Sequence, residues 1–342
     1  MKGNNCKYIV VALMLALGIQ SCNKEHVVCE EEQTPILFNH IATRAVESAS
    51  DIDEFRVWSS VATTADGPAT AQLTNERVWR DGSAWDYTNT RFWFSNHHFY
   101  FLGLYAHQGG ARHDLAFTEG SYGDEGGPRY IGYSISVQTP VTADLDILTA
   151  FNHTDTNNDY NRTVSMNFGH IMSKVNLIIK KNKVTNESDI FVLDEVRISG
   201  IKDKASYFCF PLAHDTFMGW SEIDDNSTLE FYREFDGREI GFADSESVKF
   251  SDHGLLLIPQ PIELENVMIS INFRYGFEGN DDVSTYTRKE VVVYLPVAPD
   301  LWQPGKSINY TLSLSTVDPI VFDTPSVTPW GGMQSGGTII IK

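Results

Sequence analysis

The sequence is poor in cysteine, with four in 342 residues: Cys6, Cys22, Cys29 and Cys209. None lies in a CxxC pair or at a Cys/His spacing typical of zinc sites, and the sequence alone does not pair Cys29 with Cys209. The chain is therefore not predicted to be held together by disulfides. It needs a hydrophobic core instead, and its length is sufficient for two domains.

Basic residues are scarce relative to acidic ones. The chain has 26 Lys and Arg against 45 Asp and Glu, a formal net charge of -19. No basic stripe is present, which argues against nucleic acid as a partner. The same shortage argues against electrostatic adhesion to anionic lipid headgroups.

Long apolar runs are missing after the first 20 residues. Near the start, two lysines precede the apolar run 8–18, which is too short to cross a bilayer and has the length of a secretory signal. The junction Ile19-Gln20-Ser21-Cys22 resembles the lipobox of bacterial lipoproteins. We expect residues 1–21 to be a lipoprotein signal peptide, Cys22 to carry the lipid and residues 22–34 to form a flexible leader. Ordinary signal cleavage with a free Cys22 is the alternative.

Catalytic motifs are also missing: the sequence has no GxSxG elbow, no HExxH and no P-loop. Two carboxylate pairs each bracket an apolar residue, and we interpret them as solvated faces of strands: Asp144 and Asp146, and Glu263 and Glu265. The sequence thus nominates no catalytic residue and no cofactor, and predicts that the protein is not an enzyme.

Metal-ligand patterns are weak. His97 and His98 are adjacent, so in a strand they would point to opposite faces. The polar stretch 155–159 has alternate oxygen-bearing side chains, but Tyr160 and Met166 stand where a calcium loop needs Gly and Glu. We therefore predict no metal site.

Apolar residues recur with a period of two, and no segment after the signal has a sustained helical period. The clearest stretches are 55–58, 99–105, 131–137, 175–179, 267–273 and 308–315. Such alternation is typical of antiparallel sheets with one solvated face. The predicted fold class is an all-β sandwich.

The polar run 152–161 divides these strands into two groups, and we place a domain boundary there. This predicts an N-terminal β-sandwich domain at 35–160 and a C-terminal one at 161–342. In the second half, the acidic segment 221–252 reads as an inserted loop.

Four tryptophans cluster in the first half: Trp58, Trp79, Trp85 and Trp93. Exposed tryptophans could stack on sugars, whereas buried ones fill a sandwich core. We favour burial, because Trp79 and Trp85 flank the turn at Asp81-Gly82 as a hairpin pair would.

The stretch 35–46 reads as a short half-buried strand followed by a basic residue. Ile36, Leu37, Phe38 and Ile41 supply the apolar side chains, and Arg44-Ala45 follows them. An apolar strand that ends at a protease-sensitive arginine could be used by the fold and later given up. An ordinary first strand with an unimportant Arg44 is the alternative.

Several short motifs fall in a fixed order over nearly the whole chain after the signal. They are Cys22, Thr43-Arg44-Ala45, Phe92-Trp93, Tyr100-Phe101, Tyr105, Asp146-Ile147-Leu148-Thr149-Ala150, Phe168-Gly169-His170, Leu256 to Gln260, Trp302 to Tyr310, and Val327-Thr328-Pro329-Trp330. Together they resemble the fimbrillin family, the Mfa-like subunits and related lipoproteins of type V pili. One departure is Trp93-Phe94, where the family has a tryptophan-proline pair.

The resemblance implies two tandem transthyretin-like β-sandwich domains and assembly by strand exchange. It also implies that an Arg-specific protease cuts between Arg44 and Ala45 and removes the first strand. The expected partners are other fimbrial subunits, the outer membrane through the lipid on Cys22, and a host glycan or protein ligand. The expected location is the cell surface, with lipid anchoring at least of the precursor.

A donor strand is sought at the C-terminus. Thr338, Ile339, Ile340 and Ile341 follow the glycine pairs at 331–332 and 336–337, which resemble hinges. The alternative is a last strand within its own domain. For the whole protein, the alternative function is a non-polymerising surface lipoprotein that binds glycans or host ligands.

Overall fold

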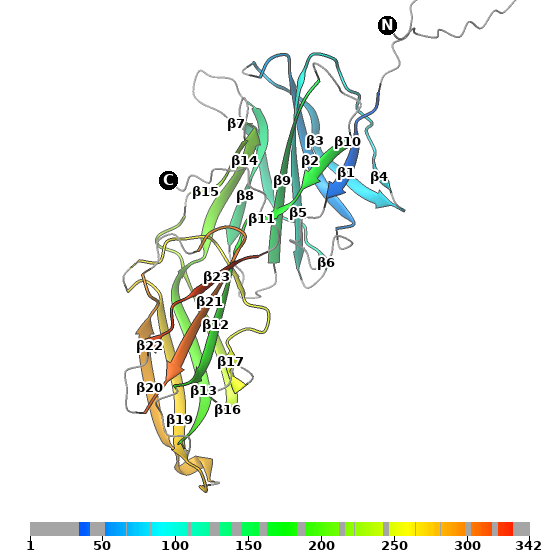
Figure 1. The fold of residues 1–342 in the computed structure, drawn as a ribbon. Coiled ribbons are helices and arrows are strands. Elements are labelled where there is room, and N and C mark those ends of the chain that lie inside the picture. The colour runs from blue at the N-terminus through cyan, green and yellow to red at the C-terminus, as the bar shows by residue number, and fades with distance from the viewer. Residues whose placement is uncertain are drawn as a thin grey trace, which may run out of the picture. The chain divides into compact units, whose positions relative to one another are not determined.

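The computed structural model describes most of the chain after the leader. The described residues are 34–41, 52–65, 67–82, 84–108, 111–122, 130–138, 145–156, 163–182, 189–211, 216–221, 223–241, 246–263, 265–280, 282–297, 302–316 and 321–330. Strands dominate these ranges, as Figure 1 shows, with a short 3-10 helix, η2 (Val283–Thr285). Within the same ranges, no helix has the length and hydropathy needed to cross a bilayer.

The first large sheet has seven strands. In sheet order they are β11 (Gly169–His170), β9 (Leu145–Asp155), β5 (His98–Gln108), β2 (Glu54–Ala62), β3 (Thr70–Asp81) and β4 (Ala84–Tyr87), with β6 (Ala111–Arg112) paired to β5. Both faces of this sheet are covered. On β5, Phe99 and Phe101 pack into one core while Leu102 and Leu104 pack into another. Because both faces are covered at β5, this strand reads as a nearly continuous apolar run, and the expectation of one solvated face is wrong for β5.

Each face of this sheet has its own cover. One is covered by the two-stranded parallel sheet of β1 (Leu37–Ile41) and β10 (Thr163–Asn167). The other is covered by a four-stranded sheet in the order β15 (Thr216–Ser221), β14 (Lys204–Pro211), β8 (Tyr130–Gln138) and β7 (Phe117–Tyr122).

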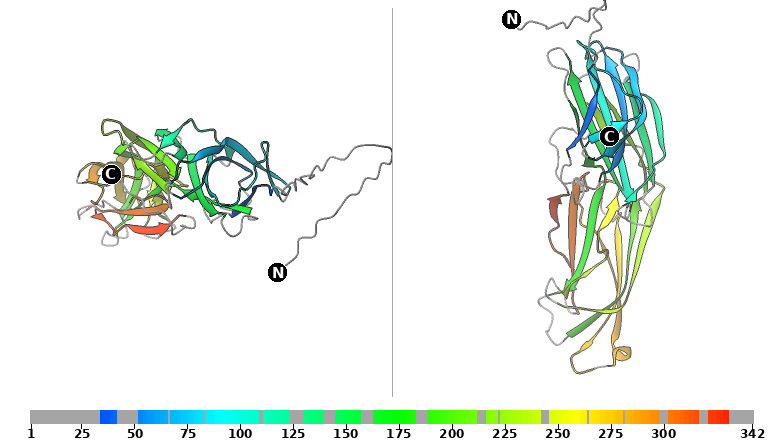
Figure 2. Two further views of the ribbon diagram at one scale, coloured as in Figure 1. Left: turned by 90° about the horizontal axis from the view of Figure 1, so that it is seen from above. Right: turned by 90° about the vertical axis from the view of Figure 1, so that its right-hand side faces the viewer.

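Two further sheets enclose a third core (Figures 1 and 2). One has the order β17 (Val248–Lys249), β12 (Ser173–Lys181), β21 (Lys306–Leu314) and β22 (Val321–Phe322), with β18 (Leu255–Leu257) on β12 and β23 (Ser326–Pro329) on β21. The other has the order β16 (Thr228–Ile240), β13 (Asp189–Lys202), β19 (Met268–Phe277) and β20 (Thr287–Tyr294). β12 alternates strictly between core and half-exposed positions, as its sequence predicts.

The predicted all-β class of antiparallel sheets is confirmed, and each period-two stretch falls on a strand to within one residue at either end. Among the described strands, two pairings are parallel, β1 with β10 and β12 with β21, and the others are antiparallel. The tryptophan prediction is also confirmed: Trp58 and Trp93 are buried, and Trp79 and Trp85 are half-buried against the core. The turn between the last two has Gly82 at a φ of 62°, which glycine adopts without strain.

Two loop predictions are wrong. β9 continues to Asp155, so the first part of the expected linker at 152–161 is strand, because its residues pair with β5. The expected loop at 221–252 contains β16, whose alternate side chains reach the core although its exposed face is charged. The domain boundary at 160 and 161 stays a prediction. Three strands that follow this boundary in sequence pair with strands that precede it: β10, β11 and β14. β15 in turn pairs with β14.

Candidate functional site

β1 is held by segments that come much later in the sequence. It lies in parallel register with β10, from Leu37 opposite Thr163 to Ile41 opposite Asn167. Just before β1, the Ile36 amide donates a hydrogen bond of 2.8 Å to the Arg91 carbonyl. β1 therefore has main-chain partners on two separate parts of the chain, and Figure 1 shows it beside β10.

The side chains of this segment alternate between core and solvent. Ile36 is 0% and Phe38 4% exposed, whereas Leu37 between them is 52% exposed. The Phe38 ring meets the rings of Tyr87 and Phe101 edge-on, with centroids 5.3 and 5.8 Å apart. Burial of two such side chains contributes about 1.5–3 kcal/mol each. Ile36 and Phe38 thus face the core, and Leu37 faces outward.

The apolar surface on which β1 packs, which we call the seat of β1, is formed by other strands. Val164 and Met166 of β10 are buried next to it, and Phe55 and Phe101 form its floor from β2 and β5. A chain without β1 would keep these strands but expose this apolar surface and an unpaired edge of β10. Such an edge pairs readily with another extended segment.

The other predicted site residues fall outside the described residues. These are the lipidation residue Cys22, the processing pair Arg44 and Ala45, and the candidate donor residues Thr338, Ile339, Ile340 and Ile341. For Ile41 the backbone pairing is described and the side chain is not. The structure thus brings together Ile36, Leu37 and Phe38, and leaves the remaining assignments as predictions.

A buried carboxylate contradicts one interpretation from the sequence. Asp146 was expected on a solvated face but is 3% exposed, with His170 Nδ1 2.8 Å and His107 Nε2 3.4 Å from its Oδ2. Burial alone raises the pKa of Asp146, but hydrogen bonds from the two histidines outweigh burial and hold this pKa below its ordinary value. The second expected pair, Glu263 and Glu265, is exposed as predicted.

The end of the last described strand packs against His170, one of the two histidines that contact Asp146. The Trp330 ring stacks on His170, with centroids 3.7 Å apart and planes at 14°. The Trp330 amide donates to the Gly305 carbonyl at 2.7 Å, and Lys174 Nζ lies 5.6 Å from the indole centroid. The sequence motif around Trp330 gave no sign of this contact, because its partners lie on distant strands. In the described part of the chain, no group of three or more His, Cys, Asp or Glu side chains could hold a metal ion.

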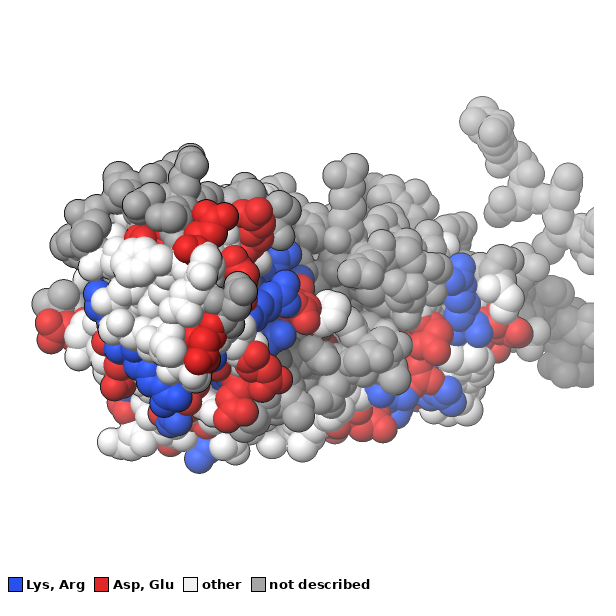
Figure 3. Space-filling view, turned by 90° about the horizontal axis from the view of Figure 1, so that it is seen from below, with Lys and Arg blue, Asp and Glu red and all other residues white. Residues whose placement is uncertain are grey.

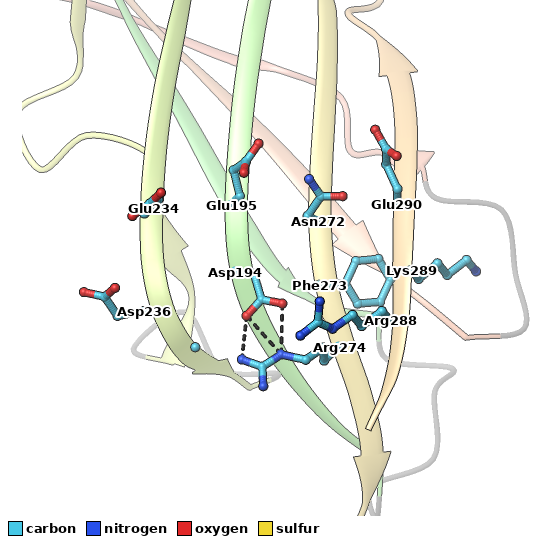
Figure 4. Close-up of a pocket in the computed structure, with 11 residues that line it drawn as sticks. Asp194, Glu195, Glu234, Asp236, Asn272, Phe273, Arg274, Arg288, Lys289 and Glu290 are labelled. Atoms are coloured by element: carbon cyan, nitrogen blue, oxygen red, sulfur yellow. Dashed lines mark hydrogen bonds and ion pairs between the residues drawn. The ribbon is translucent and has the colours of Figure 1, made fainter. Parts of the chain in front are cut away.

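A hollow of about 590 Å³ lies on the four-stranded sheet β16-β13-β19-β20 (Figure 4). A register shift at Asp194 lets its carboxylate form a bidentate ion pair with Arg274, at 2.6 and 2.9 Å. Beside this pair, Glu195, Asn272 and Glu290 face one another in one row across three strands. Among the described residues that line the hollow, none has a hydroxyl or thiol nucleophile, so these residues form no acid–base–nucleophile arrangement. Figure 3 shows acidic and basic side chains intermixed on the face seen from below.

The sequence comparison assigns the family of this all-β chain. The family model described as "Fimbrillin-like" matches residues 43–330, and the chain belongs to this family. This is a family of fimbrial proteins and not of enzymes, and its members associate with other fimbrial subunits at the cell surface. The family predicted from the sequence is thereby confirmed.

Solved structures resemble this fold. A fimbrial protein from Bacteroides vulgatus has a TM-score of 0.56 at 15% identity, covering 86% of this chain and 99% of that one. A candidate cell adhesion protein from Bacteroides ovatus has a TM-score of 0.46 at 16% identity, covering 89% and 100%. A third, from Bacteroides uniformis, has a TM-score of 0.44 at 13% identity, covering 87% and 98%. No curated protein matches the sequence.

Proposed function

We propose that the protein is a structural and adhesive, non-catalytic subunit of a cell-surface fimbria. In this proposal it is exported as a lipoprotein with lipid on Cys22 and reaches the outer membrane. A protease then cuts between Arg44 and Ala45, and the strand of a neighbouring subunit replaces β1.

The observation that supports strand exchange is the way β1 is seated. It is a separate five-residue strand, paired in parallel with β10, and Phe38 anchors it to the floor formed by β2 and β5. The predicted cleavage site lies only three residues beyond its end. Cleavage there would leave β1 held by non-covalent contacts alone, so that another strand can compete for the same seat.

The alternative of a non-polymerising glycan binder predicted exposed tryptophans in the first half. The four tryptophans there are buried or half-buried. This observation favours the fimbrial role.

Electron microscopy of cells tests the proposal. A strain without the gene should lose a class of surface fibres, and the wild-type gene should restore them. Arg44→Gln should not restore them, whereas the control Arg80→Gln, on the exposed face of β3, should. Fibres of normal number in the deletion strain would contradict the fimbrial role.

A further inference from the structure

β20 forms one edge of the four-stranded sheet β16-β13-β19-β20. Within the described residues it pairs with β19 on one side and with no strand on the other. The opposite edge, β16, meets β13 with register shifts, whereas all eight residues of β20 pair with β19 without a shift. A regular, unpaired edge readily accepts another strand. β20 is therefore a candidate interaction surface.

The main-chain groups that β20 leaves free belong to every second residue. Just beyond the strand, the Leu295 amide donates a hydrogen bond of 2.9 Å to the Val267 carbonyl, so the groups of Leu295 point toward the β19 side. Because this direction alternates along an antiparallel strand, the residues at even numbers in β20 point their N–H and C=O groups away from β19. These residues are Arg288, Glu290, Val292 and Tyr294, and all four side chains are exposed.

Arg288 and Tyr294, near the two ends of this edge, lack side-chain partners. On β19, Arg288 stands opposite Arg274, whose guanidinium is already held by Asp194 at 2.6 and 2.9 Å (Figure 4). Like charges opposite each other on adjacent strands are unfavourable. Within the described residues Arg288 forms no ion pair, and the Tyr294 ring, 44% exposed, makes no aromatic or cation contact.

The spacing of these two residues makes the edge self-complementary. Arg288 and Tyr294 lie on the same face of β20, with Val291 midway between them. If a second copy adds its own β20 in antiparallel orientation, centred on Val291, each arginine lies opposite the tyrosine of the other copy. The outer face of this sheet already contains such a pair. Arg197 and Tyr232 stand opposite each other on β13 and β16, with the guanidinium carbon 4.8 Å from the ring centroid.

The neighbouring registers are less favourable. Centring the pair of strands on Glu290 sets this carboxylate against its own copy, and centring it on Lys289 does the same with an ammonium group. Centring it on Val292 sets Pro296 opposite Arg288, and proline has no N–H to donate across the edge. The register that pairs arginine with tyrosine has neither fault.

We propose that β20 pairs with the β20 of a second copy of this chain, antiparallel and centred on Val291, so that two four-stranded sheets join into one. The interface is isologous, because both copies use the same residues. Residues 288–294 of each copy are fewer than the roughly 20–30 residues a side of a standard interface, so the dimer is weak and depends on protein concentration. It uses neither β1 nor β10 and is independent of strand exchange.

Sedimentation velocity of the full chain over a range of concentrations tests the proposal. Physiological salt screens the repulsion between two chains with a formal charge of -19. The wild type should pass from monomer to dimer as its concentration rises. Deletion of residues 338–342 should leave this dimer unchanged. A wild type that stays monomeric, or a dimer that is lost with this deletion, would overturn the proposal.

A proline variant tests whether the free main-chain groups form the contact. Val292→Pro removes an N–H that points away from β19, so it should abolish the dimer and leave the sheet intact. Val292→Thr keeps this N–H and is the matched control, which should dimerise like the wild type. Circular dichroism melting shows whether each variant is folded. A folded Val292→Pro protein that dimerises like the wild type would overturn the proposal.

A charge exchange tests the register without changing the main chain. Tyr294→Lys places an ammonium group opposite the second copy's Arg288 at two equivalent positions, so it should weaken the dimer about tenfold. Adding Arg288→Glu to this variant replaces the repulsion with attraction and should restore the dimer. A double variant that dimerises no better than Tyr294→Lys alone would contradict the register centred on Val291.

Discussion

The hydroxyl of Tyr87 donates a hydrogen bond of 2.8 Å to the carbonyl oxygen of Ile36, and it accepts one of 3.0 Å from the Arg91 amide. Tyr87 is at the end of β4 and is buried. Tyr87 would remain with its sheet if β1 left, and its hydroxyl would then lose the shorter of its two hydrogen bonds to a carbonyl oxygen, since the Arg91 carbonyl lies 3.5 Å away. A replacement strand must therefore present a carbonyl oxygen at the position of Ile36 as well as an apolar side chain at that of Phe38.

Phe38 should determine how tightly β1 is held. We expect Phe38→Ala to lower the free energy of unfolding by about 3–5 kcal/mol, because it leaves a cavity against Tyr87 and Phe101. Leu37→Ala is the matched control, since Leu37 is exposed on the same strand, and it should change this free energy by less than about 0.5 kcal/mol. Urea unfolding measures both, and hydrogen exchange at residues 36–41 shows whether the loss is local. If Phe38→Ala and Leu37→Ala lowered the free energy of unfolding equally, the packing of Phe38 against Tyr87 and Phe101 would be contradicted.

The free energy of unfolding should decrease at acid pH as Asp146 becomes protonated. Its pKa is lowered in the folded state, so its contribution is present above the ordinary pKa of about 3.9 and is lost as pH falls through the lower folded value. Asp146→Asn should reduce the free energy of unfolding at pH 7 by about 1.5–3 kcal/mol, the usual range for hydrogen bonds to a charged group.

Urea unfolding at several pH values tests this. The difference between the wild type and Asp146→Asn should shrink as pH falls below 4. Asp225→Asn, at a side chain that is 87% exposed, should differ little from the wild type at every pH. A constant difference for Asp146→Asn down to low pH would show that its charge is not what stabilises the fold.

The C-terminal segment should act as a donor if the prediction for Thr338, Ile339, Ile340 and Ile341 is right. Deletion of residues 338–342 should then abolish polymers and leave a folded, soluble monomer. Size-exclusion chromatography and circular dichroism distinguish the outcomes. An unfolded product would mean that the segment belongs to the core of its own chain.

Lipidation should depend on Cys22. Cys22→Ala should give a precursor that incorporates no labelled fatty acid. Cys209→Ala, at a buried thiol in the core between the seven-stranded sheet and β14, should be labelled like the wild type. Labelling of the Cys22→Ala protein would rule out the predicted lipobox.

The sequence predicts the strands well because their alternation reflects which side chains reach a core. It predicts the pairing poorly, because period two does not say which strands become neighbours. β1 and β10 are about 120 residues apart, and nothing in residues 35–46 indicates a parallel partner at Thr163–Asn167.

The sequence also misjudges charged residues near strands. Asp146 looks like a solvated carboxylate because it alternates with Asp144 around an apolar residue, yet His107 and His170 approach it from two other positions in the fold. The segment that forms β16 was likewise expected to be a loop, because its exposed face carries acidic side chains. In the candidate site, Ile36 and Phe38 were predictable from alternation, whereas the Tyr87 hydrogen bond required the three-dimensional arrangement.

The most direct test of the central claim is the N-terminal sequence of the subunit in purified fimbriae, read together with mass spectrometry of its peptides. If β1 is released and replaced, the assembled subunit begins at Ala45 and contains no peptide from residues 22–44. An assembled subunit that retains the lipidated Cys22 end and the whole of β1 would contradict the account.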